Sequence, residues 1–393
     1  MTVTQRTMIT LLKSAVTGDS YPLPKDFDLD EVVKLLKKHG LISMGYIGAV
    51  NCGIPKTEPV MQTMFVHYCR SAVVSQRQLD KAQEIFDAFD AAGIDYMPLK
   101  GLIMKHLYPS HELRPMGDAD ILIRVEQYDR IKPIMERLGF SEGEENEHEL
   151  PWRCDDLYVE LHKCLIPPSS QDLYSYFESG WRVALCDKNY RFKLAQEDEF
   201  VFLFCHFAKH FRGGGIGCRH VLDLWCYMRS HRELDYSYIC GELDKLYLLE
   251  FYQNMTTLIN AWFYDRGIDG RANFISNYIF QSGIWGNQFD HDLASNTKMY
   301  QTVGKVRPGK WGYFLQRVFP NFQTMSYQYP LLVKIPVLLP FIWVVRWFRI
   351  LLQKPALLKR RFKMLDSRSD DKILEWEQKM SDVGLRYWHD SEK

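Results

Sequence analysis

The residues best suited to chemistry are two aspartates, Asp118 and Asp120, which open the apolar segment DADILI. In an extended strand, residues two positions apart lie on one face, so both carboxylates point to the same side. Ala119, Ile121 and Ile123 then point to the opposite side, toward a core. Neighbouring carboxylates repel each other unless a cation lies between them, and oxygen ligands suit hard divalent cations. The pair therefore predicts a site for Mg²⁺ or Mn²⁺ on a rigid strand.

A third carboxylate, Glu160, lies in the alternating segment DDLYVELHK. Leu157, Val159 and Leu161 are expected to face the core, while Glu160 and His162 face the other way. Such an arrangement can bind one or two metal ions that bridge the phosphates of a nucleotide. His162 is compatible both with lining the site and with a hydrogen-bonded structural role. The predicted catalytic residues and metal ligands are Asp118, Asp120 and Glu160.

The surrounding sequence predicts the elements that position these acids. Residues 4–92 show helical periodicity that ends at Gly93, and residues 94–163 alternate short strands with helices. The segments IDYMPLK, DADILIR and DDLYVELHK are expected to be strands of one small mixed sheet. Helices GLIMKHLY and VEQYDRIKPIMERLG are expected between them. The fold class is therefore α+β. The predicted regions are a helical N-terminal region 1–92, a core 93–166 and a mainly helical C-terminal region 167–393.

These motifs carry a resemblance. A glycine at a strand-to-helix turn, Asp-x-Asp on the next strand and a later hydrophobic–acid–hydrophobic strand resemble the polymerase-beta nucleotidyltransferase superfamily. LKG, the Tyr108-Pro109 pair and RPMGDADILI, in which Arg114 leads into Gly117, are similar to the family of uncharacterised nucleotidyltransferases. The resemblance covers Gly93 to Lys163. A weaker likeness continues further along the chain, through His206, His210 and Asp223 to the segment near Tyr329.

The resemblance implies a Mg²⁺-dependent enzyme that moves a nucleotidyl group from a nucleoside triphosphate, such as ATP, to a small-molecule or protein hydroxyl. The superfamily has a small residue after the turn glycine, whereas Leu102 follows Gly101 here. Lys100, Arg114 and backbone amides at the start of the helix are the expected substitutes for phosphate contacts. The same departure motivates an alternative function: a noncatalytic binding or regulatory module of this fold, peripheral to a membrane. The predicted nucleotide- or phosphate-binding residues are Lys100, Gly101, Arg114 and Gly117.

A later helical segment contributes further candidates. His206 and His210 lie four residues apart and share one helix face, so a substrate-side role and ordinary packing are both open. Their segment HFAKH lacks the glutamate of HExxH, which disfavours zinc. Asp223 is interpreted as the ion-pair partner of Arg219, four residues earlier. The segment GGGIG at 213–217 lacks the lysine of a phosphate-binding loop and is interpreted as a turn.

Composition restricts the partners. The chain has 49 basic and 49 acidic residues, so no global field attracts nucleic acid, and nucleic acid is disfavoured as the acceptor. Nine scattered cysteines without a CxxC pair fit a reducing, cytoplasmic setting. Arg6 and Lys13 interrupt the N-terminal segment, so no secretory signal is expected.

The most hydrophobic segment is 330–352, PLLVKIPVLLPFIWVVRWFRILL. Its uncharged run is shorter than the roughly 20 apolar residues of a membrane-spanning helix, and it contains two prolines. We expect a helix packed on the protein's own core, with Trp343, Trp347 and Phe348 covered. The alternative is an amphipathic segment on a membrane or partner, and basic residues that follow extend this peripheral contact region to 330–363. These basic residues are Lys354, Lys359, Arg360, Arg361 and Lys363.

Overall fold

The computed structural model describes residues 1–155, 157–284, 286, 319–320, 322, 325, 329, 331–353 and 370–385. The chain divides into two units, 1–291 with 380–393, and 292–379. The first unit contains a seven-stranded mixed sheet and most of the described helices. The fold therefore combines a mixed sheet with many helices, which agrees with the predicted α+β class at that level.

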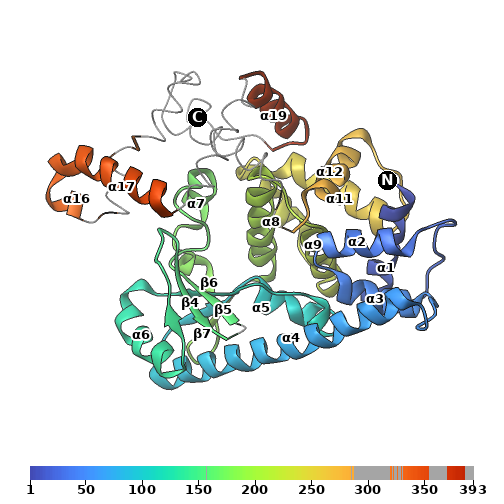
Figure 1. Ribbon diagram of the computed structural model, residues 1–393, viewed down its shortest axis with the longest axis horizontal. Coiled ribbons are helices and arrows are strands. Elements are labelled where there is room, and N and C mark those ends of the chain that lie inside the picture. Colours follow the sequence, from blue (N-terminus) through green and yellow to red (C-terminus); the bar gives the residue numbers. More distant parts are fainter. Residues whose placement is uncertain are drawn as a thin grey trace. The chain divides into compact units, whose positions relative to one another are not determined.

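Four helices precede the sheet. Their bounds are α1 Val3–Thr17, α2 Leu29–Lys38, α3 Ile42–Asn51 and α4 Pro59–Ala92. Proline at the first position of α4 suits a helix start, and Gly93 ends it with φ 65°, a conformation that favours glycine. The buried side chains Ala82, Ile85 and Phe89 form an apolar stripe on α4. α4 runs along one side of the sheet (Figure 1).

The sheet has the order β3-β4-β5-β2-β1-β7-β6. Its strands are β1 Tyr96–Pro98, β2 Ala119–Ile123, β3 Ser141–Glu142, β4 Glu149–Cys154, β5 Leu157–His162, β6 Ala184–Lys188 and β7 Arg191–Leu194. β2 pairs antiparallel with β1 and parallel with β5. The three strands predicted around the acids therefore lie in one mixed sheet, which confirms that prediction. The acidic stretch before β4 forms the loop of an antiparallel β3–β4 hairpin, also as expected.

Short helices connect these strands. They are α5 Gly101–Met104, η1 Lys105–Leu107, η2 His111–Leu113, η3 Val125–Gln127 and α6 Tyr128–Arg137. The two faces of the sheet differ in character. Ala119, Ile121 and Val159 join one hydrophobic cluster with side chains of α4 and α6. Asp120 and His162 point to the opposite face, because side chains alternate along a strand. The alternation read from the sequence thus places the acids on the face away from α4.

The sheet extends beyond the predicted core. β6 and β7 form an antiparallel hairpin, and β7 pairs in parallel with β1. These strands lie in the region predicted to be mainly helical. Their short segments ALCDK and RFKL carry mostly exposed or half-buried side chains, so they give a weak strand signal. The sequence boundary at residue 166 therefore falls before two strands of the sheet.

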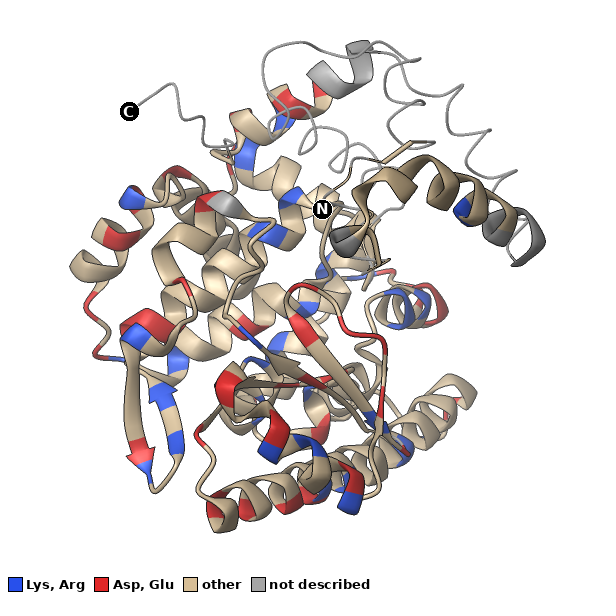
Figure 2. Cartoon of the chain, turned by 90° about the vertical axis from the view of Figure 1, so that its left-hand side faces the viewer, with Lys and Arg blue, Asp and Glu red and all other residues tan. Residues whose placement is uncertain are grey.

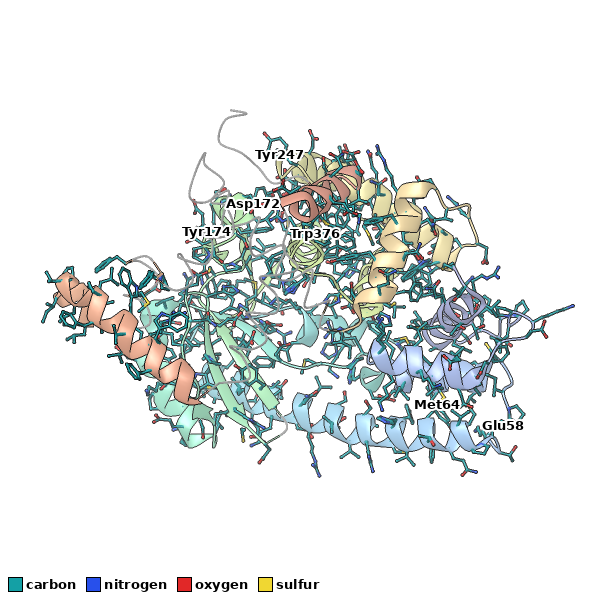
Figure 3. The ribbon with its side chains drawn as sticks, turned by 45° about the horizontal axis from the view of Figure 1, so that its top comes forward. Glu58, Met64, Asp172, Tyr174, Tyr247 and Trp376 are labelled. Carbon is teal, nitrogen blue, oxygen red and sulfur yellow. The ribbon has the colours of Figure 1, made fainter. Side chains whose placement is uncertain are left out.

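The remaining elements of the first unit are helical. They are α7 Gln171–Phe177, η4 Trp181–Val183, α8 Gln196–Arg212, α9 Cys218–Ser230, α10 Tyr236–Lys245, α11 Leu249–Phe263 and α12 Gly270–Ser282. Asp172 of α7, labelled in Figure 3, forms an ion pair with Arg212 at the end of α8 at 2.7 Å. The glycine-rich segment is a turn between α8 and α9, as predicted. Gly215 has φ 103° there, and a Cβ would lie 2.1 Å from Ser282 Oγ.

The second unit contains the hydrophobic segment. Its described helices are α16 Leu331–Lys334, η5 Pro336–Leu338 and α17 Leu339–Gln353, and α19 Asp370–Asp382 begins in this unit. Trp343 donates its Nε1–H to Pro320 O at 2.9 Å and is half-buried, as is Trp347. Phe348 is 62% exposed, so the prediction that neighbouring helices cover it is wrong.

Phe348 lies on an exposed apolar stripe of α17. Val344 and Phe341, one and two helical turns earlier, are 55% and 68% exposed and belong to the same apolar stripe. Within the part of the chain that the structure describes, no helix combines the length and the apolarity needed to cross a membrane. The basic residues at 354–363 lie outside the described residues.

Candidate active site

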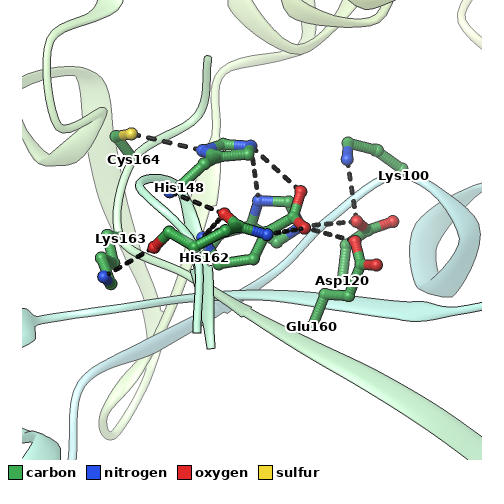
Figure 4. Close-up of polar contacts among 9 residues, drawn as sticks. Lys100, Asp120, His148, Glu160, His162, Lys163 and Cys164 are labelled. Carbon is green, nitrogen blue, oxygen red and sulfur yellow. Dashed lines mark hydrogen bonds and ion pairs between the residues drawn. The ribbon is translucent and has the colours of Figure 1, made fainter. Parts of the chain in front are cut away.

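Asp120 is the centre of the site. Its Oδ1 accepts hydrogen bonds from Lys100 Nζ at 2.8 Å and from His162 Nε2 at 2.6 Å (Figure 4). The Asp120 side chain is only 5% exposed, and the side chain of Lys100 is 13% exposed. Glu160 lies beside Asp120, because the two residues are register partners in the parallel β2–β5 ladder. The strands therefore hold two carboxylates next to each other on one face.

The surroundings shift the pKa values of the two carboxyl groups in opposite directions. Burial opposes ionisation of Asp120, but Lys100 and His162 outweigh it and lower the pKa of Asp120 below its ordinary range. For Glu160, burial and the neighbouring Glu149, Asp118 and Asp120 raise the pKa to about 8. Burial and Asp120 also raise the pKa of Asp118. Burial and repulsion between neighbouring carboxylates thus both disfavour the ionised forms of Glu160 and Asp118.

The closest group of ligand atoms differs from the predicted carboxylate triad. Among the described residues, two sets of three potential ligands have all their ligand atoms within 4.8 Å of one another. The sets are Asp120–Glu160–His162 and His148–Glu149–His162. Asp118 belongs to neither, although it is close enough to raise the pKa of Glu160. The structure thus brings Asp120 and Glu160 together, leaves Asp118 outside both sets and adds a histidine.

Sequence reasoning missed the residues behind His162. His162 Nδ1 lies 3.0 Å from His148 Nε2, and His148 Nδ1 lies 3.3 Å from Cys164 Sγ (Figure 4). Glu149 and His162 are register partners in the antiparallel β4–β5 ladder, which brings His148 next to His162. Only the register of that hairpin could have identified His148, because 14 residues separate it from His162.

The turn before α5 is already well hydrogen-bonded. Lys100 has φ 42° and precedes Gly101, whose Cβ, if present, would lie 2.7 Å from Arg114 Nη1. The turn therefore requires glycine at 101, because the Arg114 side chain occupies that space. The amide of Leu102 donates to Leu99 O, and the amide of Ile103 donates to Lys100 O. These two amides are used within the turn, so phosphate contacts there remain a prediction for Lys100 and Gly101.

Arg114 has a structural partner. Its Nε and Nη2 donate to the two carboxylate oxygens of Asp223 at 3.2 and 3.0 Å, and both side chains are at most 10% exposed. Tyr108 donates its hydroxyl to the same carboxylate at 2.8 Å. The interpretation of Asp223 as the partner of Arg219 is therefore wrong. Arg219 donates to Pro115 O instead, because the fold brings the loop before β2 against α9. The phosphate role of Arg114 stays a prediction.

The remaining predicted residues lie around the same region. His206 and His210 pack ring against ring on α8, with centroids 4.4 Å apart. Burial lowers the pKa of both rings. The nearby Lys100 lowers both further, whereas Asp120 acts on His210 in the opposite direction. Gly117 is exposed, and nothing lies within 4 Å of the position a Cβ would take. The fold therefore brings the α8 pair near the acids, as a substrate-side role requires.

The fold and site define the class of protein: a mixed α/β protein whose sheet carries buried, mutually repelling carboxyl groups of the kind that bind cations. The chain belongs to the family described as uncharacterised nucleotidyltransferase, whose model matches residues 25–264. This confirms the predicted resemblance, and the match contains every predicted site residue but ends before Tyr329. The family description supports a transferase. No curated protein and no solved structure matches the chain.

Proposed function

We propose that this protein is a Mg²⁺- or Mn²⁺-dependent nucleotidyltransferase that moves a nucleotidyl group from a nucleoside triphosphate to a small-molecule or protein hydroxyl. The observation that carries the proposal is the Asp120–Glu160 pair. Two carboxyl groups face each other across β2 and β5, and one of them has a pKa near 8 because of burial and neighbouring acids. Membership of the nucleotidyltransferase family supports nucleotidyl transfer as the reaction at this pair.

The donor set fits a divalent cation. Asp118, Asp120 and Glu160 offer the oxygen ligands that Mg²⁺ prefers. The ammonium of Lys100 lies against Asp120, where it neutralises one carboxylate in the metal-free chain. When bound, the metal would stabilise the negative charge that develops on the transferring phosphoryl group. The carboxylates would hold it, and Asp120, on a central strand, would fix its position relative to the nucleotide.

The other residues take roles on the two substrates. Lys100 at the turn, with Gly101 and the open surface at Gly117, is assigned to the phosphates. His206 and His210 on α8 are assigned to the acceptor side, because the charge of Lys100 acts on both rings and that of Asp120 acts on His210. Nucleic acid is not the assigned acceptor. In the view of Figure 2, Lys and Arg alternate with Asp and Glu along the described ribbon, whereas backbone binding favours basic residues clustered on one face.

A thermal-shift measurement tests the proposal first. Magnesium with the correct triphosphate should raise the melting temperature, since a ligand that binds only the folded chain stabilises it by mass action. Asp118→Asn should remove most of this shift and lower nucleotidyl transfer on the order of a hundredfold. Asp129→Asn on the exposed face of α6 is the matched control and should leave both unchanged.

Transfer itself is measured with labelled triphosphates and a cell extract, followed by mass spectrometry of the labelled product. Circular dichroism checks that each variant is folded. A folded Asp118→Asn protein with normal transfer would show that the Asp118–Asp120 pair is not the metal site. The absence of any shift with each nucleotide would favour the alternative function, a noncatalytic module of the same fold.

A further inference from the structure

A chain of hydrogen bonds leads from Asp120 into the interior. Asp120 Oδ1 contacts His162 Nε2 at 2.6 Å, His162 Nδ1 contacts His148 Nε2 at 3.0 Å, and His148 Nδ1 contacts Cys164 Sγ at 3.3 Å. The His162 side chain is 0% exposed and that of His148 is 7% exposed. His162 therefore cannot touch a substrate, and its partner on the site side is the carboxylate of Asp120.

The Asp120 carboxylate determines which atom donates in each of these hydrogen bonds. A carboxylate oxygen only accepts, so His162 Nε2 carries a hydrogen. A neutral His162 ring carries its single hydrogen on Nε2, which leaves Nδ1 as an acceptor. His162 Nδ1 then accepts from His148 Nε2–H, and His148 Nδ1 accepts from the Cys164 thiol. Each ring donates once and accepts once, so all four ring nitrogens are satisfied in a single arrangement.

The scaffold holds these rings in place. His162 is the last residue of β5, and His148 immediately precedes β4, its antiparallel neighbour. The amide of Lys163 donates to His148 O at 2.9 Å, which fixes the backbone between the two histidines. Lys100, the other partner of Asp120, reaches it on a flexible four-carbon side chain. Of the two partners, His162 is therefore the one that can fix a direction.

We propose that His162 is a positioning residue for Asp120: its Nε2–H holds Oδ1 and sets the direction in which the other carboxylate oxygen faces a cation, while His148 fixes the tautomer of His162. The inference rests on the proposed function, since it assigns Asp120 as a metal ligand. It gives His162 a role without substrate contact and brings His148 into the site. Mutation of residues that orient metal ligands in this way commonly lowers metal affinity or activity about 10- to 100-fold.

The test measures Mn²⁺ binding to the full chain by electron paramagnetic resonance, which counts free Mn²⁺. His162→Leu removes the donor at similar volume and should weaken binding about 10- to 100-fold. His162→Gln places an amide N–H near the position of Nε2 and should restore most of the affinity. His67→Leu, at an exposed position on α4, is the control and should bind like the wild type. Rescue by glutamine separates a donor role from mere packing.

A second measurement does not depend on a variant that folds. Long-range ¹H–¹⁵N spectra of the wild-type chain should show His162 and His148 as neutral Nε2–H tautomers. A His162 resonance with hydrogen on Nδ1 alone would overturn the proposal. So would a folded His162→Leu protein with wild-type Mn²⁺ affinity. If the wild type fails to bind Mn²⁺, the proposed metal-dependent function is refuted, and the positioning role is refuted with it.

Discussion

Replacing Glu160 by glutamine removes a carboxyl group whose ionised form is disfavoured in the folded chain. The Glu160 pKa is about 8 in the folded chain, against an ordinary value of 4.5. The folded state therefore keeps this proton over a pH range in which the unfolded chain has lost it. For a raised acid pKa, the sign is fixed: wild-type stability falls as the pH rises from about 4.5 to about 8.

The pKa difference sets the size of the effect. One pKa unit corresponds to 1.36 kcal/mol, so the full shift amounts to about 5 kcal/mol at most. The Glu160 side chain is 17% exposed, so solvent screens this penalty only in part. Glu160→Gln should therefore match the wild type near pH 4.5 and exceed it by roughly 3–5 kcal/mol at pH 9 in the absence of metal.

Urea unfolding in EDTA at pH 4.5, 7 and 9 measures this difference for both proteins. The relevant quantity is the variant-minus-wild-type free energy of unfolding, because other groups that titrate in both proteins cancel. Glu136→Gln on the exposed face of α6 provides the matched control, with no expected dependence on pH. A Glu160→Gln difference that stays constant from pH 4.5 to 9 would refute the reasoning, since Glu160 would then have no raised pKa.

Two further variants separate structure from chemistry. Asp223→Asn leaves the buried Arg114 without its counter-charge, so it should lower the free energy of unfolding by about 3–5 kcal/mol, measured by urea titration, without changing Mn²⁺ affinity per folded molecule. A selective loss of metal binding would contradict this. Lys100→Met removes the ammonium assigned to phosphate. It should raise the KM for the triphosphate about tenfold, because one charge-assisted hydrogen bond to the phosphate is lost. An unchanged KM in steady-state kinetics would leave Lys100 as a partner of Asp120 alone.

The sequence predicted the local geometry of the site because that geometry depends on strand periodicity. Asp120 and Glu160 face the same side since each lies between apolar core residues, and this alternation needs no knowledge of the rest of the fold. That the three strands share one mixed sheet was likewise predicted, whereas their pairing and register were not. Family membership followed from the same motifs, spaced along one continuous segment.

Contacts between distant segments were not predictable in this way. Asp223 pairs with Arg114, 109 residues away, and not with the neighbouring Arg219. The i, i+4 rule describes a helix surface, whereas α9 buries this aspartate against the loop before β2. His148 was missed for a related reason, since its contact depends on the register of a hairpin. Phe348 was wrongly assigned to the interior because hydrophobicity alone does not say what covers a side chain.

The opposite pKa shifts of Asp120 and Glu160 also bear on how the site would bind a cation and phosphates. Lys100 and His162 keep Asp120 ionised, while burial and the neighbouring acids keep Glu160 protonated near neutral pH. A lysine and a proton thus offset the charges of Asp120 and Glu160. A cation between the carboxylates would favour ionised Glu160 and would compete with Lys100 for Asp120. The ammonium released from Asp120 would then lie at the turn where the phosphates are expected. His162, fixed from behind by His148, would keep its hydrogen bond throughout, so the ligand would remain oriented while its other partner changes.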